Sequence, residues 1–210
     1  MPARGDHDAR RRDVSEAVWR VLAARGFDGL TLRAVAAEMN ASTGLLTHYF
    51  PTKRALVRHA LDLAGERTGT RSRPAPPAPG LPALRTTLLD VLPRTAPAVE
   101  LNRVWVSSWD AALGDPDLGD RERDRYERWR GELRAHLEKA VELGELPPDA
   151  DVEDLAASAA AFTHGLVVQV LFDPDRFPPE RQAALLDAFL GSLAHRPGRP
   201  EGTPRPITPT

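Results

Sequence analysis

The hydrophobic and polar positions between residues 26 and 58 predict two short helices joined by a tight break. Thr31 precedes the first helix, where its hydroxyl can cap a free backbone amide of the first turn. The pattern breaks at Asn40, and Ser42 is placed to cap a second helix that ends near Pro51. The apolar positions of the first helix follow the i, i+3, i+4, i+7 spacing of one buried face: Leu32, Val35, Ala36 and Met39.

The second helix begins with small polar residues, Ser42, Thr43 and Gly44. Two short helices joined by a turn of three or four residues describe a helix-turn-helix. The second helix of such a pair enters the major groove of DNA by its N-terminal residues, because a slim and polar helix end reaches the base edges. The sequence therefore predicts a DNA-binding element near the N-terminus.

This region resembles the DNA-binding domain of TetR-family transcriptional regulators, over about the first quarter of the chain. Two positions depart from the usual string of the family: Asn40 replaces a turn glycine, and Thr47 replaces a common tyrosine. Asparagine is tolerated in the turn because it adopts left-handed backbone conformations more readily than most residues. The matching residues are Thr31, Val35, Ala36, Ala41, Ser42, Gly44, Leu46, Tyr49, Phe50, Lys53 and Leu56.

The resemblance implies that these helices carry the DNA contacts. Arg33 is either an ordinary exposed arginine or a bidentate donor to a guanine. Tyr49 either reaches the DNA backbone through its hydroxyl or completes the core, and Lys53 is expected to contact a phosphate. The residues expected to contact DNA are Thr31, Arg33, Ser42, Thr43, Gly44, Leu45, Thr47, His48, Tyr49 and Lys53.

Helical periodicity continues through the rest of the chain, and no strand alternation interrupts it. We predict an all-α fold with a DNA-binding domain over residues 1–51 and an effector-binding and dimerisation domain over residues 52–195. The first helix is expected from about residue 8 to residue 25. The second domain opens with a connecting helix at 52–68 and a proline-rich loop at 70–82, and the tail at 196–210 is expected to be disordered.

Charge and composition agree with this division. Residues 1–60 carry ten Arg and Lys against six Asp and Glu, whereas residues 61–210 carry eighteen against twenty-four. A basic head on an acidic body is typical of a duplex-binding module attached to a non-binding domain. Cysteine is absent, which excludes a disulfide framework and a thiolate metal site. We expect no apolar run near the ~20 residues that span a bilayer, and therefore a cytoplasmic protein with no membrane partner.

The segments RVWVSSWDAALGDPDL, YERWRGEL and GELPPDADVEDLAA resemble the C-terminal domain of the BetI-like branch of the family. A regulator of this kind implies a small-molecule effector in an apolar cavity with a few polar anchors. Aromatic residues at helical spacing are also common in plain cores, so the same residues have a purely structural interpretation. The residues expected to line the pocket are Asn102, Trp105, Ser108, Trp109, Tyr126, Trp129, Phe162, His164 and Gln169.

The resemblance also implies a homodimer. The family pairs its last two helices with their copies, and the segment 151–172 is rich in small residues that let helices approach closely. The alternative is that both helices serve only the core of their own subunit. The residues expected in the interface are Ala156, Ala160, Thr163, Val167, Leu186, Phe189 and Leu190.

These features together predict a ligand-responsive repressor that binds a palindromic operator in double-stranded DNA as a homodimer. The six histidines show no metal-ligand spacing, and the sequence has no phosphate loop or nucleophile elbow, so we assign no catalytic site, metal or cofactor. Two alternatives stay open at this point. One is a DNA-binding regulator that needs no ligand, and the other is an all-α interaction or enzyme domain with an incidental helix-turn-helix.

Overall fold

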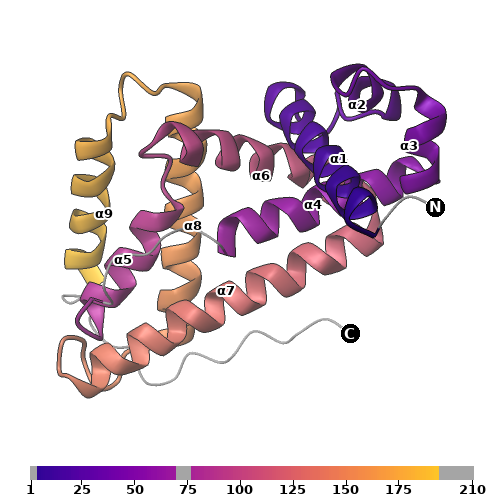
Figure 1. Ribbon diagram of the computed structural model, residues 1–210. Coiled ribbons are helices and arrows are strands. Elements are labelled where there is room, and N and C mark those ends of the chain that lie inside the picture. Colours follow the sequence, from indigo (N-terminus) through magenta and orange to yellow (C-terminus); the bar gives the residue numbers. More distant parts are fainter. Residues whose placement is uncertain (1–3, 70–76, 194–210) are drawn as a thin grey trace. The chain divides into compact units, whose positions relative to one another are not determined.

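The computed structural model describes residues 4–69 and 77–193, and over these residues it is built from helices without strands, which confirms the all-α prediction (Figure 1). The described residues form two compact units. The first contains α1 to α4, α6 and the part of α7 up to residue 123, and the second contains α5, the rest of α7, α8 and α9. The helices are α1 (Arg4–Arg25), α2 (Leu32–Glu38), α3 (Thr43–Tyr49), α4 (Lys53–Gly69), α5 (Leu81–Val91), α6 (Ala96–Gly114), α7 (Pro116–Glu142), α8 (Val152–Phe172) and α9 (Pro179–Leu193).

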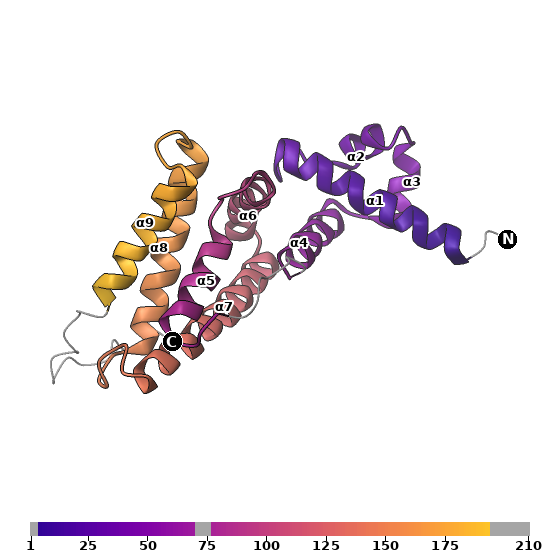
Figure 2. The same ribbon diagram turned by 60° about the vertical axis from the view of Figure 1, so that its left-hand side comes forward.

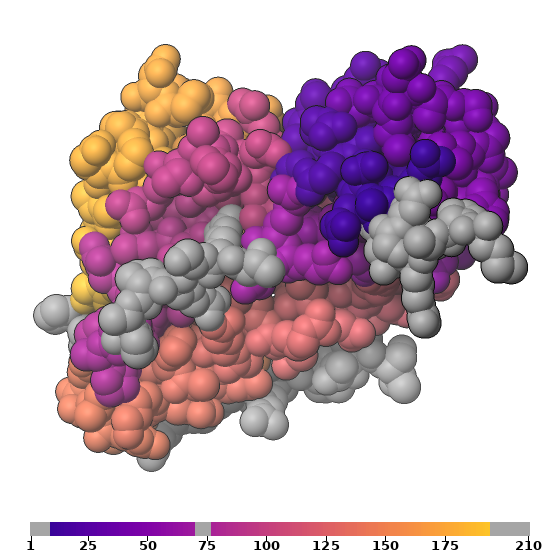
Figure 3. All heavy atoms as spheres, viewed as in Figure 1, coloured from indigo at the N-terminus to yellow at the C-terminus, as the bar shows by residue number. Residues whose placement is uncertain are grey.

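The first unit has one hydrophobic core to which each of its helices contributes. On the face seen in Figure 3, the indigo and violet atoms of α1, α2 and α3 are in contact across the surface. Helix α1 begins at Arg4, four residues before the predicted start. The largest fully buried side chains of this core include Leu22, Leu30, Leu46 and Leu56.

Helices α4 and α6 pack against α1 and complete this core. The indole Nε1 of Trp19 on α1 donates a hydrogen bond to Glu100 on α6, and the guanidinium of Arg67 on α4 lies 4.3 Å from the centre of the same indole ring. The compact unit that holds the helix-turn-helix therefore extends beyond the predicted domain boundary after residue 51. That prediction followed the limits of the motif, which carry no information about packing by α4 and α6.

The second unit packs α5, α8 and α9 together. Helices α8 and α9 run antiparallel and lie side by side in both views (Figure 1; Figure 2). The start of α5 is fixed by the backbone amide of Leu81, which donates to Glu145 Oε2 at 2.7 Å. Gly80 precedes it with φ of 86°, and a Cβ at this position would lie 2.2 Å from the same carboxylate oxygen. The positive φ favours glycine where the chain turns into α5, and a Cβ would in addition displace the carboxylate that holds the Leu81 amide.

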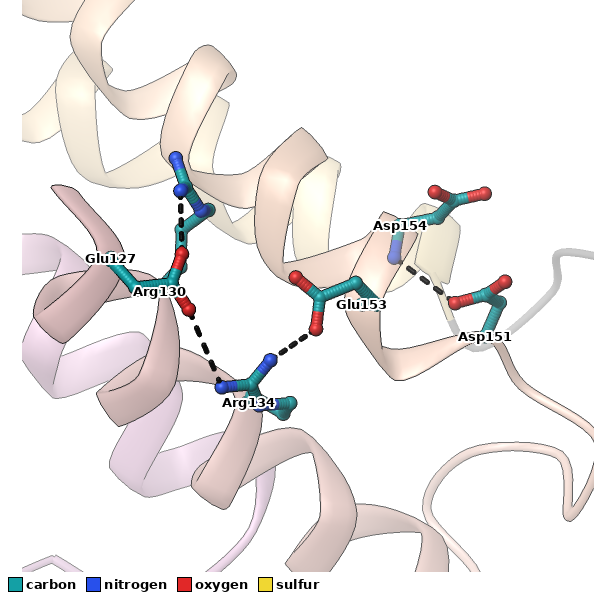
Figure 4. Close-up of polar contacts among 6 residues, drawn as sticks. All are labelled: Glu127, Arg130, Arg134, Asp151, Glu153 and Asp154. Carbon is teal, nitrogen blue, oxygen red and sulfur yellow. Dashed lines mark hydrogen bonds and ion pairs between the residues drawn. The ribbon is translucent and has the colours of Figure 1, made fainter. Parts of the chain in front are cut away.

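A chain of ion pairs joins α7 to the start of α8 within the second unit (Figure 4). Arg130 Nη2 lies 2.7 Å from Glu127 Oε2, Glu127 Oε1 lies 3.9 Å from Arg134 Nη2, and Arg134 also contacts Glu153. The hydrogen bond from Arg130 lowers the pKa of the Glu127 carboxyl, and the hydrogen bond to Glu153 raises the pKa of Arg134. All four side chains are substantially exposed, so this network orients α8 more than it stabilises the fold.

Helix α8 corrects the expectation that no apolar run approaches the length needed to span a bilayer. By length and composition alone, α8 is long and apolar enough to cross a membrane. One side of it is nevertheless buried against its own unit, including Leu155, Ala159, Leu166 and Val170. A core helix of a water-soluble unit reaches the same apolar content. Of the predicted proline-rich loop, residues 70–76 lie outside the described residues, as does the predicted disordered tail at 196–210.

Candidate nucleic-acid interface

The helix-turn-helix forms with the caps that the sequence predicts. The Thr31 hydroxyl accepts a hydrogen bond from the backbone amide of Ala34 at 3.1 Å, and the Ser42 hydroxyl accepts one from Leu45 at 3.4 Å. Asn40 stands between the helices with φ of 49°, in the left-handed region that suits asparagine. These contacts fix the direction in which α3 leaves the turn.

Helix α3 has one buried side and one exposed side. Leu46 is fully buried, and Phe50 directly after the helix is nearly so, as the sequence predicts. Thr43, Thr47 and His48 are exposed, and the Thr47 hydroxyl donates to the carbonyl of Thr43 at 3.0 Å. The hydroxyl oxygen of Thr47 therefore still has lone pairs to accept a further hydrogen bond.

Gly44 lies in the first turn of α3, on its exposed side. A Cβ added there would meet only the Ser42 hydroxyl oxygen, at an ordinary 3.8 Å. The chain's own packing therefore does not require a glycine at this position, although glycine costs about 1 kcal/mol of helix propensity relative to alanine. The absence of a side chain leaves the backbone of α3 open to close approach at Gly44.

The remaining predicted contact residues divide between exposed and half-buried positions. Arg33 and Lys53 are exposed and form no ion pair with other described residues. Leu45 and Tyr49 are half-buried and pack against the core, so part of each side chain serves the fold. Lys53 is the first residue of α4, and Thr52, where the sequence predicts the start of that helix, instead caps it by accepting from the amide of Ala55 at 3.1 Å.

The residues predicted to line an effector pocket fall into both units. Asn102, Trp105, Ser108 and Trp109 belong to α6 in the first unit. There the Asn102 and Ser108 side chains donate to carbonyls of their own helix, and the indole of Trp105 donates to Thr68 on α4. These polar groups thus hold local structure together.

In the second unit, the structure brings Tyr126, Trp129 and His164 together. The His164 ring lies 5.2 Å from the ring centre of Tyr126 and 4.8 Å from that of Trp129. Burial, and secondarily the positive charge of Arg125, lower the pKa of His164 to about 4, so its imidazole is neutral near pH 7. Phe162 and Gln169 instead line a groove between α8 and α9.

The residues predicted for the dimer interface are mostly buried within their own subunit. Ala156, Thr163 and Leu186 are fully buried in the second unit. Val167, Ala160 and Leu190 expose 1%, 6% and 7% of their surfaces, and the half-buried Phe189 stacks on Phe162 with ring centres 4.4 Å apart. The outward surface of α8 is formed by other residues: Ala157, Ala161, Gly165, Gln169 and Phe172.

Sequence reasoning missed a cleft of about 230 Å³ between α1, the end of α3 and α4. Arg11, His48 and His59 bring polar groups to it. The three consecutive arginines of α1 were the available signal, but the sequence could not show which of them faces α3. Within the described residues, no group of three or more acidic or histidine side chains is arranged to hold a metal ion.

Family models match both regions of the chain. Residues 15–60 match the model of the bacterial regulatory proteins of the tetR family, and residues 81–195 match the model of the BetI-type transcriptional repressor C-terminal domain. The chain is 30% identical over 195 residues to the HTH-type transcriptional regulator PksA of Bacillus subtilis (strain 168), and the match covers 92% of this chain and 94% of PksA. It is 29% identical over 170 residues to the regulator BetI of Burkholderia mallei (strain NCTC 10229), covering 79% and 84% of the two chains.

Solved structures show the same fold. A transcriptional regulator from Rhodococcus sp. Rha1 is 26% identical with a TM-score of 0.71, over 88% of this chain and 95% of that one. A transcriptional regulator from Saccharomonospora viridis, solved in complex with choline, is 23% identical with a TM-score of 0.74, over 88% and 96% of the two chains.

An all-α fold that exposes a capped, polar helix after a tight turn defines a DNA-binding protein of the helix-turn-helix class. The matches over both regions place it more narrowly. The chain belongs to the TetR family of bacterial transcriptional regulators, and its C-terminal region is of the BetI type.

Proposed function

We propose that the protein is a cytoplasmic, ligand-responsive repressor that binds a palindromic operator as a homodimer and reads base edges with α3. The exposed side of α3 carries this proposal. Thr43, Gly44, Thr47 and His48 are all exposed and small or polar, whereas Leu46 on the opposite side is fully buried. A helix with this division has one side for the core and one for the major groove.

The proposed contacts differ in what they recognise. Thr43 and Thr47 lie one turn apart and meet base edges, and Leu45 offers an apolar contact to a thymine methyl. Arg33 on α2 bonds a guanine, while Tyr49 and Lys53 contact phosphates. Thr31 and Ser42 act indirectly, since their hydroxyls already cap the two helices.

Binding to randomised duplex DNA tests this assignment. We expect Thr43→Ala or Thr47→Ala to change the base preference at one operator position by ~1–3 kcal/mol. Lys53→Ala should instead weaken binding to all sequences and lower the salt slope of log K by about 1. Thr86→Ala is the control, because Thr86 makes the same hydrogen bond to a carbonyl four residues earlier, in α5 of the second unit. Base preferences unchanged in both threonine variants would exclude α3 as the reading helix.

We place the dimer interface on the outward surface of α8, with α9 beside it. Ala157, Ala161 and Gly165 lie along this surface, and Phe172, 84% exposed, lies at its end. A Cβ added to Gly165 would meet nothing within 4 Å, so the fold of the single chain gives no reason for a glycine in the middle of the helix. A partner helix that packs closely at this point supplies one.

Sedimentation of Gly165→Leu tests the interface. Position 165 is exposed and an added Cβ meets nothing in the single chain, so the variant should fold. The leucine side chain should hold the partner helix away and yield monomers with weaker operator binding. Gly65→Leu is a matched control, since Gly65 lies inside α4 and its added Cβ also meets nothing within 4 Å. A wild-type monomer at micromolar concentration, or a Gly165→Leu dimer as tight as the control, would refute this interface.

For the effector, we propose that Tyr126, Trp129 and His164 form part of its site. The charge that acts on His164 is the guanidinium of Arg125, which also lies 4.6 Å from the ring centre of Tyr126. The guanidinium of Arg125 already lies over the Tyr126 ring, where a cationic ligand would stack, so the cluster favours a neutral or anionic effector over a quaternary ammonium such as choline.

Thermal unfolding with added ligand distinguishes these classes. We expect millimolar choline to leave the melting temperature unchanged. A rise in melting temperature that Trp129→Ala abolishes would instead assign the cluster to quaternary ammonium ligands. If no small molecule shifts DNA binding in an operator-release screen, the regulator acts without a ligand.

A further inference from the structure

The cleft between α1, the end of α3 and α4 has an apolar floor and a polar rim. Val14 and Phe50 form the floor, exposing 1% and 6% of their surfaces. Arg11 and His48 are exposed at the rim, and His59 is half-buried at the side formed by α4. The cleft opens beside His48, which is on the same helix as the residues proposed to read DNA.

The polar groups of the cleft differ in how firmly they are held. The Nε2 atom of His59 lies 3.0 Å from the Ser15 hydroxyl, and the His59 ring packs 5.1 Å from that of Phe50, so its position is fixed from two sides. Arg11 forms no ion pair with another described residue, and none of the residues with described side chains that line the cleft is a carboxylate.

The charges around His59 come from two helices. Asp62 and Glu66, on its own helix α4, act on it from outside the cleft lining, and Arg11 acts from α1. Burial, opposed by Asp62 and assisted by Arg11, lowers the pKa of His59 and favours its neutral form, whereas the guanidinium of Arg11 keeps its positive charge.

We propose that this cleft holds one phosphate of the DNA backbone, bound by the guanidinium of Arg11 from one side and the imidazole of His48 from the other. A guanidinium suits a phosphate because its planar donors match two oxygens at once. A phosphate held by both side chains would link the end of α3 to α1. This link would fix the angle at which α3 enters the groove. This inference rests on the proposed reading of DNA by α3 and adds a contact outside the helix-turn-helix.

The neighbouring arginines of α1 make a sharp experiment possible. Arg10 and Arg12 are exposed on the same helix and carry the same charge, but neither lines the cleft. We expect Arg11→Ala to weaken binding to every duplex by tenfold or more and to lower the salt slope of log K by about 1. Arg10→Ala and Arg12→Ala should each change the affinity by less than threefold. Equal losses in all three variants, or no loss in Arg11→Ala, would overturn the proposal.

Interference by phosphate ethylation locates the contact. With the wild-type protein, ethylation of one phosphate in each half-site should block binding through the cleft, and that position should disappear from the pattern of Arg11→Ala alone. The same pattern in wild type and Arg11→Ala would place Arg11 away from the backbone while leaving the reading by α3 intact. A wild-type protein that shows no interference at any phosphate would instead contradict the proposed function itself.

A titration with inorganic phosphate separates the DNA backbone from a free anion as the occupant. We expect the ring resonances of His48 and His59 to stay unchanged in up to 10 mM phosphate without DNA. A saturable shift that Arg11→Ala removes and Arg10→Ala retains would show that the cleft is a site for free phosphate, which would overturn the assignment to the backbone.

Discussion

The helix-turn-helix and the α8–α9 pair are both consecutive helices with one buried side, but they present opposite kinds of surface. The outward side of α3 is polar, with Thr43, Thr47 and His48 exposed. The outward side of α8 is apolar, with small residues along it and Phe172 at its end. A polar outward surface fits a hydrated, charged partner, and an apolar one fits another protein surface. The two regions are therefore suited to two different kinds of partner.

The largest expected effect tests whether the inner side of α9 belongs to the core of the subunit. Leu186 is fully buried in the second unit, so Leu186→Ala should destabilise the protein by about 2–5 kcal/mol. Leu113→Ala should change stability very little, because Leu113 is 89% exposed. Urea unfolding measures both. If both variants lose equally little unfolding free energy, Leu186 is not part of the subunit core and instead lies on a surface that a partner covers.

Acid should weaken the second unit through His164. The pKa of this imidazole is lowered to about 4 in the folded chain, against about 6.5 in the unfolded chain. Above about pH 6.5 the imidazole is neutral in both states, and the protein keeps its full stability. As pH falls from there towards 4, the unfolded chain takes up the proton first, and stability is lost. The loss should reach about 3 kcal/mol at most.

Replacing the imidazole isolates this effect. Stability measured from pH 7 to pH 4 should fall less steeply in His164→Phe than in wild type. The pKa of His59 is lowered as well, so a residual slope of the same sign is expected in the variant. Parallel curves for variant and wild type would show that His164 titrates normally.

The caps of the helix-turn-helix should matter less. Thr31→Ala removes the acceptor for the Ala34 amide and should cost ~1 kcal/mol, whereas Thr31→Gly should cost only a few tenths of that. Amide hydrogen exchange at Ala34 should accelerate in the alanine variant. If exchange there is unchanged while global stability drops, the hydroxyl serves some contact other than the cap.

The smallest expected effect lies in the turn. Asn40→Gly should change stability by less than about 0.5 kcal/mol, because both residues adopt the left-handed conformation found there. Asn40→Ala should cost about 1 kcal/mol, since a Cβ-bearing residue without a local polar side chain disfavours that region. Thermal unfolding of the pair against wild type gives both values, and an alanine variant as stable as wild type would show that the turn relaxes.

The sequence predicted the helix-turn-helix closely because its signals are local. Thr31 and Ser42 cap the helices, and Asn40 takes the left-handed turn conformation. Each of these residues lies within a few positions of the apolar residues from which the helices were predicted. In α8, apolar residues lie on both sides, so periodicity could not say which side faces the subunit core. Ala156 and Thr163 were therefore predicted to meet a partner, although both are fully buried in their own subunit. The Arg11 cleft depends on α4 lying beside α1, which no local pattern encodes.

The two units alternate along the sequence, and this order has a consequence for folding during synthesis. The first unit is built from residues on both sides of α5, which belongs to the second unit. Leu101 and Val104 of α6 lie in the same core as Trp19 and Leu22 of α1. A chain that has been synthesised only as far as residue 69 therefore lacks part of the core on which its DNA-binding helices rest. Cotranslational folding can complete this unit only after the ribosome has released α6, so the helix-turn-helix gains its full core only after α5 of the second unit has been synthesised.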